Sequence, residues 1–179
     1  MRNASFVIAV GAVFAGVLVA ALVVLAAVPA WRAARAAGRP GLAALAAALS
    51  LGADGVWIGT RFIATPEAYG VVGYKDALLR TAEDGTTISR GYTGKTCRVI
   101  ANGYTRFWEA HPDELQPFPM QFLRSVQDGA NHLGQGTDLP APEVDPDKEF
   151  WPAGQGVGAI DELVPAGELV TRFVEEAEA

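Results

Sequence analysis

A short apolar run in the middle of the chain ends in two residues that could bind an anion. Residues 55–59 read GVWIG, and Thr60 follows Gly59 directly. Glycine lets a ligand approach the backbone closely, and threonine adds a hydroxyl group. When such a pair closes a strand of a parallel sheet, its free N–H groups suit a phosphate. We therefore predict an anion site at Gly59 and Thr60, although an ordinary turn would need the same two residue types.

Elements on both sides are predicted to hold this pair in place. Residues 41–51 carry leucines on one helical stripe, and Gly52 is positioned to end that helix in a left-handed cap. Residues 55–59 are compact and apolar, as strands buried on both faces of a parallel sheet are. Thr65 precedes a proline and predicts a second helix start, with Glu67 near the positive helix end. Helix, strand and helix in this order indicate an α/β repeat.

The remaining chain is predicted to contain short elements separated by loops. These are a helix at 74–82, a β-prone segment at 86–94, a helical segment at 98–111, a helix at 120–130 within a long loop, and a terminal helix after Pro165. The side chains expected to point inward are Leu78, Leu79, Val99, Phe107, Trp108, Leu169, Val170 and Phe173.

Composition excludes several classes of function. The net charge is −6, and residues 109–179 carry fifteen acidic against three basic side chains. Nucleic-acid binding needs clustered cations, so no nucleic-acid partner is expected. The single cysteine, Cys97, excludes an internal disulfide, and we interpret it as an ordinary small side chain. With two distant histidines, this one cysteine cannot supply tetrahedral metal ligands, so no metal is expected.

The N-terminal apolar run, residues 6–28, has three interpretations. It is long enough to cross a bilayer, and the arginines after it would place the C-terminal side in the cytoplasm. It could be a signal peptide, although its apolar core is longer than usual. It could also be a non-native start joined to a domain whose earlier part is absent. We therefore expect a cytoplasmic protein, with membrane contact through residues 6–28 as one alternative.

Neither histidine is a good candidate for catalysis. His111 follows a predicted helix and precedes a proline, so we interpret it as a C-terminal helix cap. His132 lies in a glycine-rich loop, where exposure to solvent is expected. We therefore predict no catalytic residue.

Four separate blocks of the sequence resemble the nitronate monooxygenase family, also called 2-nitropropane dioxygenases. They read AALSLGADGVWIGTRFIAT, YKDALL, SRGYTGKTCRVIANGYTRFW and PAGQGVGAIDELVPAGELV, and they occur in the family's order. The resemblance covers about residues 40–179 and concerns the C-terminal part of the family. It implies an α/β fold, a partial TIM (β/α)8 barrel with the last strand and the C-terminal helical region, preceded here by the N-terminal apolar helix. It also implies FMN as the cofactor and oxidation of alkyl nitronates by O2 to carbonyl compounds and nitrite.

The same resemblance assigns the site residues. Gly59 and Thr60 match the family's contacts to the FMN phosphate, and Gln155 and Gly156 match a loop that closes near the flavin. Arg61 either supports the loop at Gly59 and Thr60 through salt bridges or is solvated. Two departures stand out. Arginine and proline interrupt the glycines of the expected phosphate loop at 38–41, and the family's Gly-Gly-His motif is absent.

We therefore expect an apolar helix at 1–30, the C-terminal part of an FMN-binding barrel at 31–110, and a loop and helix extension of the same domain at 111–179. The expected function is that of a nitronate monooxygenase, here as a truncated and inactive fragment. One alternative is a related flavin barrel, such as an enoyl-acyl-carrier-protein reductase or a NAD(P)H-quinone reductase. Another is a membrane-tethered interaction module without catalysis.

Overall fold

The computed structural model describes residues 45, 47–132 and 144–178. The chain divides into two compact units. The larger spans Val56–Val174, and it contains all four predicted cofactor-binding residues. Residues 47–53 belong to the smaller unit.

In the smaller unit, the predicted helix at 41–51 ends as expected. Gly52 has a φ of 91°, in the left-handed region that favours glycine. Its amide donates to the Leu49 carbonyl at 2.9 Å, and the Ala53 amide donates to the Ala48 carbonyl at 3.0 Å. This pair of bonds is the Schellman arrangement, so the predicted glycine cap is confirmed.

The apolar run at residues 6–28 and the interrupted loop at 38–41 lie outside the described residues. The interpretations of both therefore stay predictions. Among the helices that the structure describes, none is both long and apolar enough to span a bilayer.

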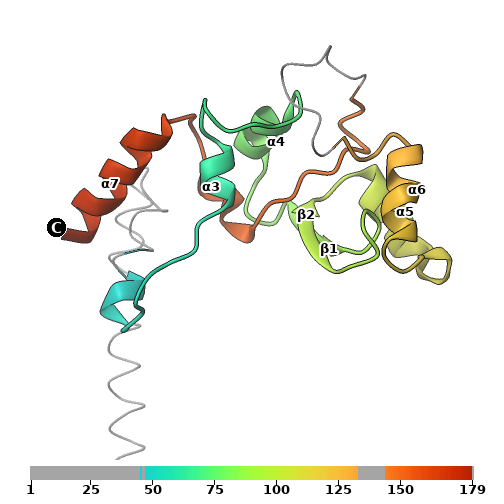
Figure 1. Cartoon of the computed structure of the whole chain (residues 1–179), viewed down its shortest axis with the longest axis horizontal. Helices are drawn as coiled ribbons and strands as arrows, with labels where there is room; N and C mark the ends of the chain where they lie inside the picture. Colours follow the sequence, from blue (N-terminus) through green and yellow to red (C-terminus); the bar gives the residue numbers. More distant parts are fainter. Residues whose placement is uncertain (1–44, 46, 133–143, 179) are drawn as a thin grey trace, which may run out of the picture. The chain divides into compact units, whose positions relative to one another are not determined.

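The larger unit consists of short helices around one two-stranded sheet (Figure 1). Its predicted helices at 74–82 and 120–130 are confirmed, although they end two and three residues earlier than predicted. The β-prone segment at 86–94 is confirmed only over its first four residues, which form a strand. The helices are α3 (Thr60–Ile63), α4 (Tyr74–Arg80), α5 (Gly103–Ala110), α6 (Met120–Gln127) and the start of α7 (Ala166–Glu178). The short 3-10 helices are η1 (Pro112–Glu114) and η2 (Gln155–Ala159), and the strands are β1 (Thr86–Ser89) and β2 (Cys97–Ile100).

A late segment of the chain returns to the sheet. Strands β1 and β2 pair antiparallel, and residues near 152 then lie along the free side of β2. The Ile100 amide donates to the Trp151 carbonyl at 2.9 Å, and the Ala153 amide donates to the Arg98 carbonyl at 3.2 Å. These bonds fix where the chain enters η2, which follows directly.

Two apolar clusters form the core of this unit. Successive side chains of an extended segment point to opposite sides, so the neighbours Phe150 and Trp151 enter different clusters. One cluster consists of Ala64, Val71, Tyr74, Leu78, Trp151, Ala153, Val157 and Ile160. The other consists of Tyr92, Val99, Tyr104, Trp108, Ala130 and Phe150.

The predicted strand at 55–59 is not a strand. Val56 to Ile58 lie in no helix or strand of the described residues, and Trp57 is 100% exposed. A strand needs a hydrogen-bonded neighbour, and the described part of this chain supplies none here. The prediction rested on composition, which records the apolar character of the segment but not whether a partner is present.

The helical prediction for 98–111 was wrong at its beginning. β2 occupies Cys97–Ile100, because the β-branched Val99 and Ile100 find β1 as a pairing partner. α5 starts only after Asn102, whose side chain accepts a hydrogen bond from the Thr105 amide at 3.0 Å in a capping box.

The helix predicted to begin at Thr65 does not form. The Thr65 hydroxyl donates to the Phe62 carbonyl at 2.9 Å and closes the end of α3. Both carboxylate oxygens of Glu67 accept the Ala166 amide at 3.1 Å. Glu67 therefore meets the positive end of α7, ninety-nine residues away, instead of the start of a local helix.

Most predicted inward side chains are buried, and two are not. Leu78, Val99, Trp108, Leu169 and Phe173 lie in the interior, and Leu79 is half-buried. Phe107 is 45% exposed and Val170 is 50% exposed, which contradicts the prediction for both. Each follows or precedes a buried residue on its helix, and helical spacing alone did not separate them.

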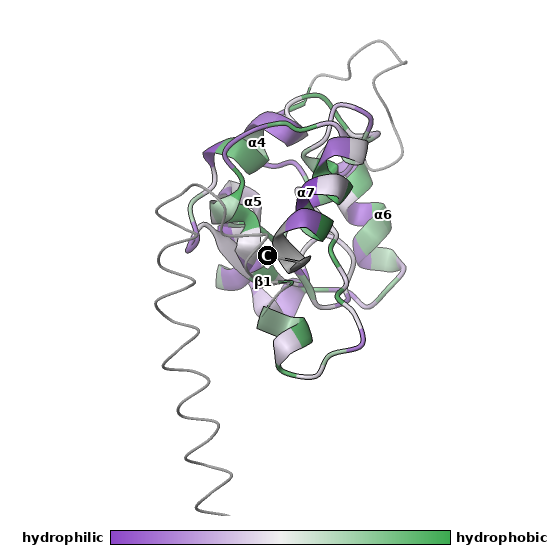
Figure 2. Ribbon diagram, turned by 90° about the vertical axis from the view of Figure 1, so that its left-hand side faces the viewer, coloured by the Kyte–Doolittle hydropathy of each residue, from purple (hydrophilic) through white to green (hydrophobic). Residues whose placement is uncertain are grey.

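Helix α6 carries its polar residues inward. Gln121 and Ser125 are fully buried, whereas Met120, Leu123 and Val126 are about half exposed. Figure 2 shows much of α6 in the green of hydrophobic residues. The buried side chains are hydrogen-bonded to the Gly91 and Tyr92 carbonyls, which explains why polar residues can occupy the interior.

Candidate functional site

The structure brings the two predicted halves of the site together. The Gly154 amide donates a hydrogen bond to the Thr60 hydroxyl oxygen at 2.9 Å, across ninety-four residues of sequence. Gly59 and Thr60 therefore lie beside the loop that carries Gln155 and Gly156. Gly154 is a member of the site that the sequence analysis did not single out. Its only signal was its place in the AGQGVG stretch.

The site has room for a ligand. Gly59, Gly154, Gln155 and Gly156 are all exposed. A Cβ atom added at Gly59 or at Gly156 would meet nothing within 4 Å. The described protein around Gly59 and Gly156 is therefore open, as a backbone that contacts a phosphate group must be.

Thr60 is oriented in a way that suits an anion. A hydroxyl group has one hydrogen to donate and two lone pairs to accept with. The Gly154 amide uses one lone pair, and Thr60 donates to no acceptor among the described residues. The hydroxyl hydrogen is thus available to a phosphate oxygen.

The loop beyond Gly154 is anchored by its apolar residues. In η2, Val157 is fully buried in the first core cluster, and the Ile160 amide donates to the Val157 carbonyl at 2.9 Å. The Tyr74 hydroxyl donates to the Pro152 carbonyl just before the loop. Gln155 and Gly156 are therefore displayed from a fixed base.

Arg61 supports the loop and does not point at the candidate anion site. Its guanidinium donates to the Ala64 carbonyl at 3.0 Å and to the Glu162 carbonyl at 3.1 Å. Burial lowers the pKa of this guanidinium, while the nearby Glu162 and Asp161 carboxylates raise it. Of the two interpretations of Arg61, the structure favours the supporting one, through backbone carbonyls.

The two histidines have structural roles. His111 is the C-cap of α5, and its Nδ1 lies 2.8 Å from the Phe107 carbonyl, which confirms the predicted cap. The expected exposure of His132 was wrong. Its Nδ1 lies 2.6 Å from Oε2 of the fully buried Glu149, and its amide donates to Oε1 at 3.1 Å. A partner seventeen residues away left no local signal in the sequence.

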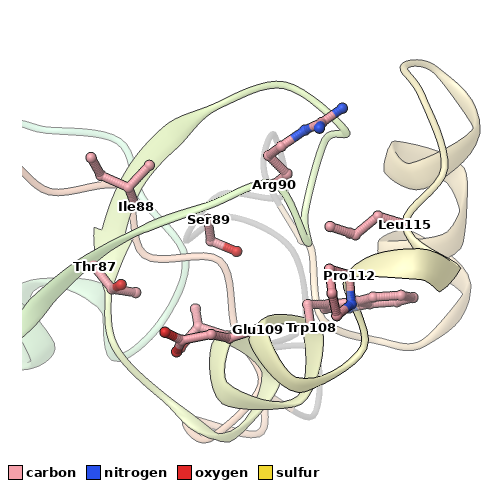
Figure 3. Close-up of a pocket in the computed structure, with 9 residues that line it drawn as sticks. Thr87, Ile88, Ser89, Arg90, Trp108, Glu109, Pro112 and Leu115 are labelled. Carbon is pink, nitrogen blue, oxygen red and sulfur yellow. The ribbon is translucent and has the colours of Figure 1, made fainter.

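A separate groove lies between β1, α5 and η1 (Figure 3). It measures about 200 Å³ and includes none of the four predicted site residues. Arg90 and Glu109 lie on opposite sides of it in the view. The Trp108 indole N–H in its wall is buried and has no acceptor in the described part of the chain. Because that N–H is not reached from solvent, it offers no contact to a ligand in the groove.

No group of three metal-ligating side chains occurs within the described residues. Cys97 is half-buried, and burial raises the pKa of its thiol. Its Sγ lies 3.4 Å from the Ser89 carbonyl on the neighbouring strand. These contacts are those of a small side chain packed in a sheet.

Two relatives match most of this chain. A candidate monooxygenase of Mycobacterium tuberculosis is 33% identical over 133 residues, which are 74% of this chain and 35% of that protein. A nitronate monooxygenase of Paraburkholderia phytofirmans is 31% identical over 141 residues, 75% of this chain and 34% of that protein. The chain therefore spans about a third of the length of the curated relatives it matches.

Two solved structures share its fold. A nitroalkane oxidase from Streptomyces ansochromogenes matches with a TM-score of 0.60 and 29% identity, over 75% of this chain and 35% of the other. FabK from Thermotoga maritima matches with a TM-score of 0.56 and 26% identity, over 74% of this chain and 40% of the other. These matches agree with the expected part of an α/β barrel.

A comparison with family models shows to which family the chain belongs. The family model for nitronate monooxygenase matches residues 36–176, which include both halves of the candidate site. The chain therefore belongs to the nitronate monooxygenase family of enzymes.

Proposed function

We propose that this chain forms the phosphate-binding end of an FMN-dependent nitronate monooxygenase. The reaction is the oxidation of an alkyl nitronate by O2 to a carbonyl compound and nitrite. The observation that carries the proposal is the hydrogen bond from the Gly154 amide to Thr60, because it joins the two segments assigned to one cofactor. Family membership supports the reaction class.

Each residue has a distinct role in this proposal. Thr60 donates its hydroxyl hydrogen to the phosphate, and Gly59 lets the phosphate approach the backbone. Gly154 positions the Thr60 hydroxyl, and Gln155 and Gly156 line the wall nearer the flavin ring. Bound FMN would supply the redox chemistry with O2.

By itself the chain is expected to bind FMN weakly and to show no turnover. His111 and His132 are the only histidines, and both are engaged in structural contacts. Neither is a member of the candidate site, so no basic imidazole is placed there to take a proton. No described side chain or backbone atom lies within 4 Å of a Cβ added at Gly59 or Gly156, so few further contacts to the cofactor are expected there.

The proposal is tested by titrating the full chain with FMN and measuring the quenching of flavin fluorescence. Thr60→Val keeps the shape of the side chain and removes the donor, so we expect roughly tenfold weaker binding, about one charge-assisted hydrogen bond. Thr171→Val is the matched control, since Thr171 is exposed and bonds only within α7 to the Gly167 carbonyl. Equal affinities of the two variants, or tight binding followed by nitrite release from the unaided chain, would contradict the proposal.

A second candidate is a related flavin-dependent reductase that oxidises a nicotinamide. The structural match to FabK supports this second candidate. The two candidates differ in their products. Nicotinamide oxidation without O2-dependent nitrite would favour the reductase.

A further inference from the structure

Strand β1 is the free edge of the two-stranded sheet. Within the described residues it pairs with β2 alone, whereas β2 also bonds to the returning segment near residue 152. The four residues of β1, TTIS, include no charged residue and no proline. Proteins commonly place those residue types on an exposed edge to prevent pairing. The described part of the chain therefore leaves this edge open to another strand.

The register of the sheet shows which main-chain groups of β1 remain unpaired. The Ile100 amide donates to the returning segment, on the side of β2 that faces away from β1. Main-chain groups of successive strand residues point to opposite sides, so Val99 faces β1, where its partner is Thr87. The N–H and C=O groups of the neighbouring Thr86 and Ile88 then point outward. No described residue forms a main-chain hydrogen bond with them.

The two ends of β1 carry opposite charges. Asp84 lies two residues before Thr86, and Arg90 lies two residues after Ile88. Both charged side chains are exposed, and neither is in an ion pair in the described part of the chain. The Arg90 Nε donates to the carbonyl four residues further on at 3.1 Å, which orients the guanidinium. Figure 3 shows Ile88 and Arg90 pointing away from Trp108.

We propose that β1 is a homodimer interface, where two copies of this chain pair their β1 strands antiparallel about a two-fold axis at Thr87. In this register Thr86 lies opposite Ile88 of the second copy, and the two exchange main-chain hydrogen bonds. The contact also covers part of the Ile88 side chain, which is 59% exposed in the single chain. Asp84 lies opposite Arg90 of the second copy, and the symmetry makes each contact twice.

The charges select this register among the symmetric ones. The outward main-chain groups must face each other, so the axis can move only to a neighbouring residue of the strand. An axis at Thr86 would place Asp84 opposite Ile88, and an axis at Ile88 would place Arg90 opposite Thr86. Only the axis at Thr87 places opposite charges opposite each other. This complementarity identifies a second copy of the chain as the occupant of the edge.

The interface is independent of the proposed function. None of its residues belongs to the candidate cofactor site, so the dimer and FMN binding are tested separately. A single pair of short strands makes a small interface, and we expect a dimer that dissociates on dilution.

The test measures the dissociation constant of the full chain by sedimentation equilibrium. Asp84→Arg places like charges opposite each other at both ends of the strand pair, so we expect dissociation at an at least about tenfold higher concentration. Combining Asp84→Arg with Arg90→Asp restores opposite charges and should return the dissociation constant close to that of the wild type. Asp76→Arg is the matched control, because it makes the same change of charge at an exposed residue of α4.

Hydrogen exchange gives a second readout at the edge itself. The Thr86 and Ile88 amides become ladder donors in the dimer, so their exchange should slow by at least about tenfold as the chain concentration rises through the dissociation constant. Asp84→Arg should remove this dependence on concentration, and Asp76→Arg should keep it.

Rescue of the dimer by the double substitution, together with concentration-dependent protection of Thr86 and Ile88, supports the interface. A single chain at every concentration would overturn it. So would equal effects of Asp84→Arg and Asp76→Arg, or a double variant that stays as weak as Asp84→Arg. Protection of the Thr86 and Ile88 amides in the dilute single chain would also overturn it, because another segment of the same chain would then cover the edge.

Discussion

At the scale of single residues, the least expected feature is the pair formed by His132 and Glu149. The Glu149 carboxylate is fully buried, and His132 supplies a donor to each of its oxygens, one from the backbone and one from the ring. A buried carboxylate is stable only when it is paired and hydrogen-bonded. The pair therefore holds the segment that follows α6 and the segment before Trp151 together.

Removing the ring of His132 should destabilise the protein strongly. Among the described residues, His132→Ala leaves the buried Glu149 carboxylate with the His132 backbone donor only, and breaking such a pair costs about 3–5 kcal/mol. The measurement is the free energy of unfolding in urea. His111→Ala is the control, because its ring is exposed and its loss removes only a helix-cap contact. A similar, small effect of both substitutions would show that Glu149 is satisfied without the imidazole.

The stability that Glu67 contributes to the fold is expected to depend on pH. Hydrogen bonds from the backbone amides of Glu67 itself and of Ala166 hold the pKa of this carboxyl below its ordinary value of 4.5. Because the folded pKa is lowered, its stabilising contribution is present above pH 4.5 and disappears as the pH falls through the folded pKa. Unfolding curves of the wild type and Glu67→Gln should differ at pH 7 and converge in acid. A difference that is constant with pH would contradict this role.

At the scale of elements, α6 shows how hydrogen bonds can reverse the usual burial pattern. Gln121 donates to the Gly91 carbonyl at 2.6 Å and accepts the Gln116 amide at 3.0 Å. Ser125 donates to the Tyr92 carbonyl at 2.8 Å. The buried polar side chains of α6 thus donate hydrogen bonds to backbone carbonyls in the turn after β1, which the sheet does not pair.

Gln121→Ala should therefore cost more than the removal of a larger apolar side chain beside it. The substitution leaves the buried Gly91 carbonyl without its donor, at an expected cost of about 1–3 kcal/mol. Met120→Ala is the matched control, because Met120 is the adjacent residue of α6 and is half exposed. Both variants are compared by thermal and urea unfolding. A larger loss for Met120→Ala would mean that the outward face of α6 is covered in solution.

Elements were predicted well where local signals decide them. Gly52, the leucines of α4 and the β-prone residues of β1 all act over a few positions, and each prediction was confirmed. β2 was misassigned because Val99 and Ile100 are compatible with a helix until β1 is present to pair with them. The helix expected after Thr65 failed for a related reason, since Glu67 bonds to α7 instead.

At the scale of the whole molecule, the family could be read from the sequence. The blocks around Gly59 and around Gln155 pointed to the nitronate monooxygenase family, and the family match over 36–176 agrees. The cofactor-binding roles of Gly59, Thr60, Gln155 and Gly156 remain predictions. The sequence also recorded the apolar character of residues 55–59 but not their solvent exposure.

The sequence by itself determined the family, the glycine cap at Gly52, and the elements α4 and β1, because caps, turns and motifs depend on residues that are neighbours in the chain. Only the tertiary structure decided that Thr60 meets Gly154, that Glu67 meets α7 and that His132 meets Glu149. Each of these contacts joins residues between seventeen and ninety-nine positions apart. No local propensity encodes such a pairing, since it exists only when folding has brought the two distant segments together.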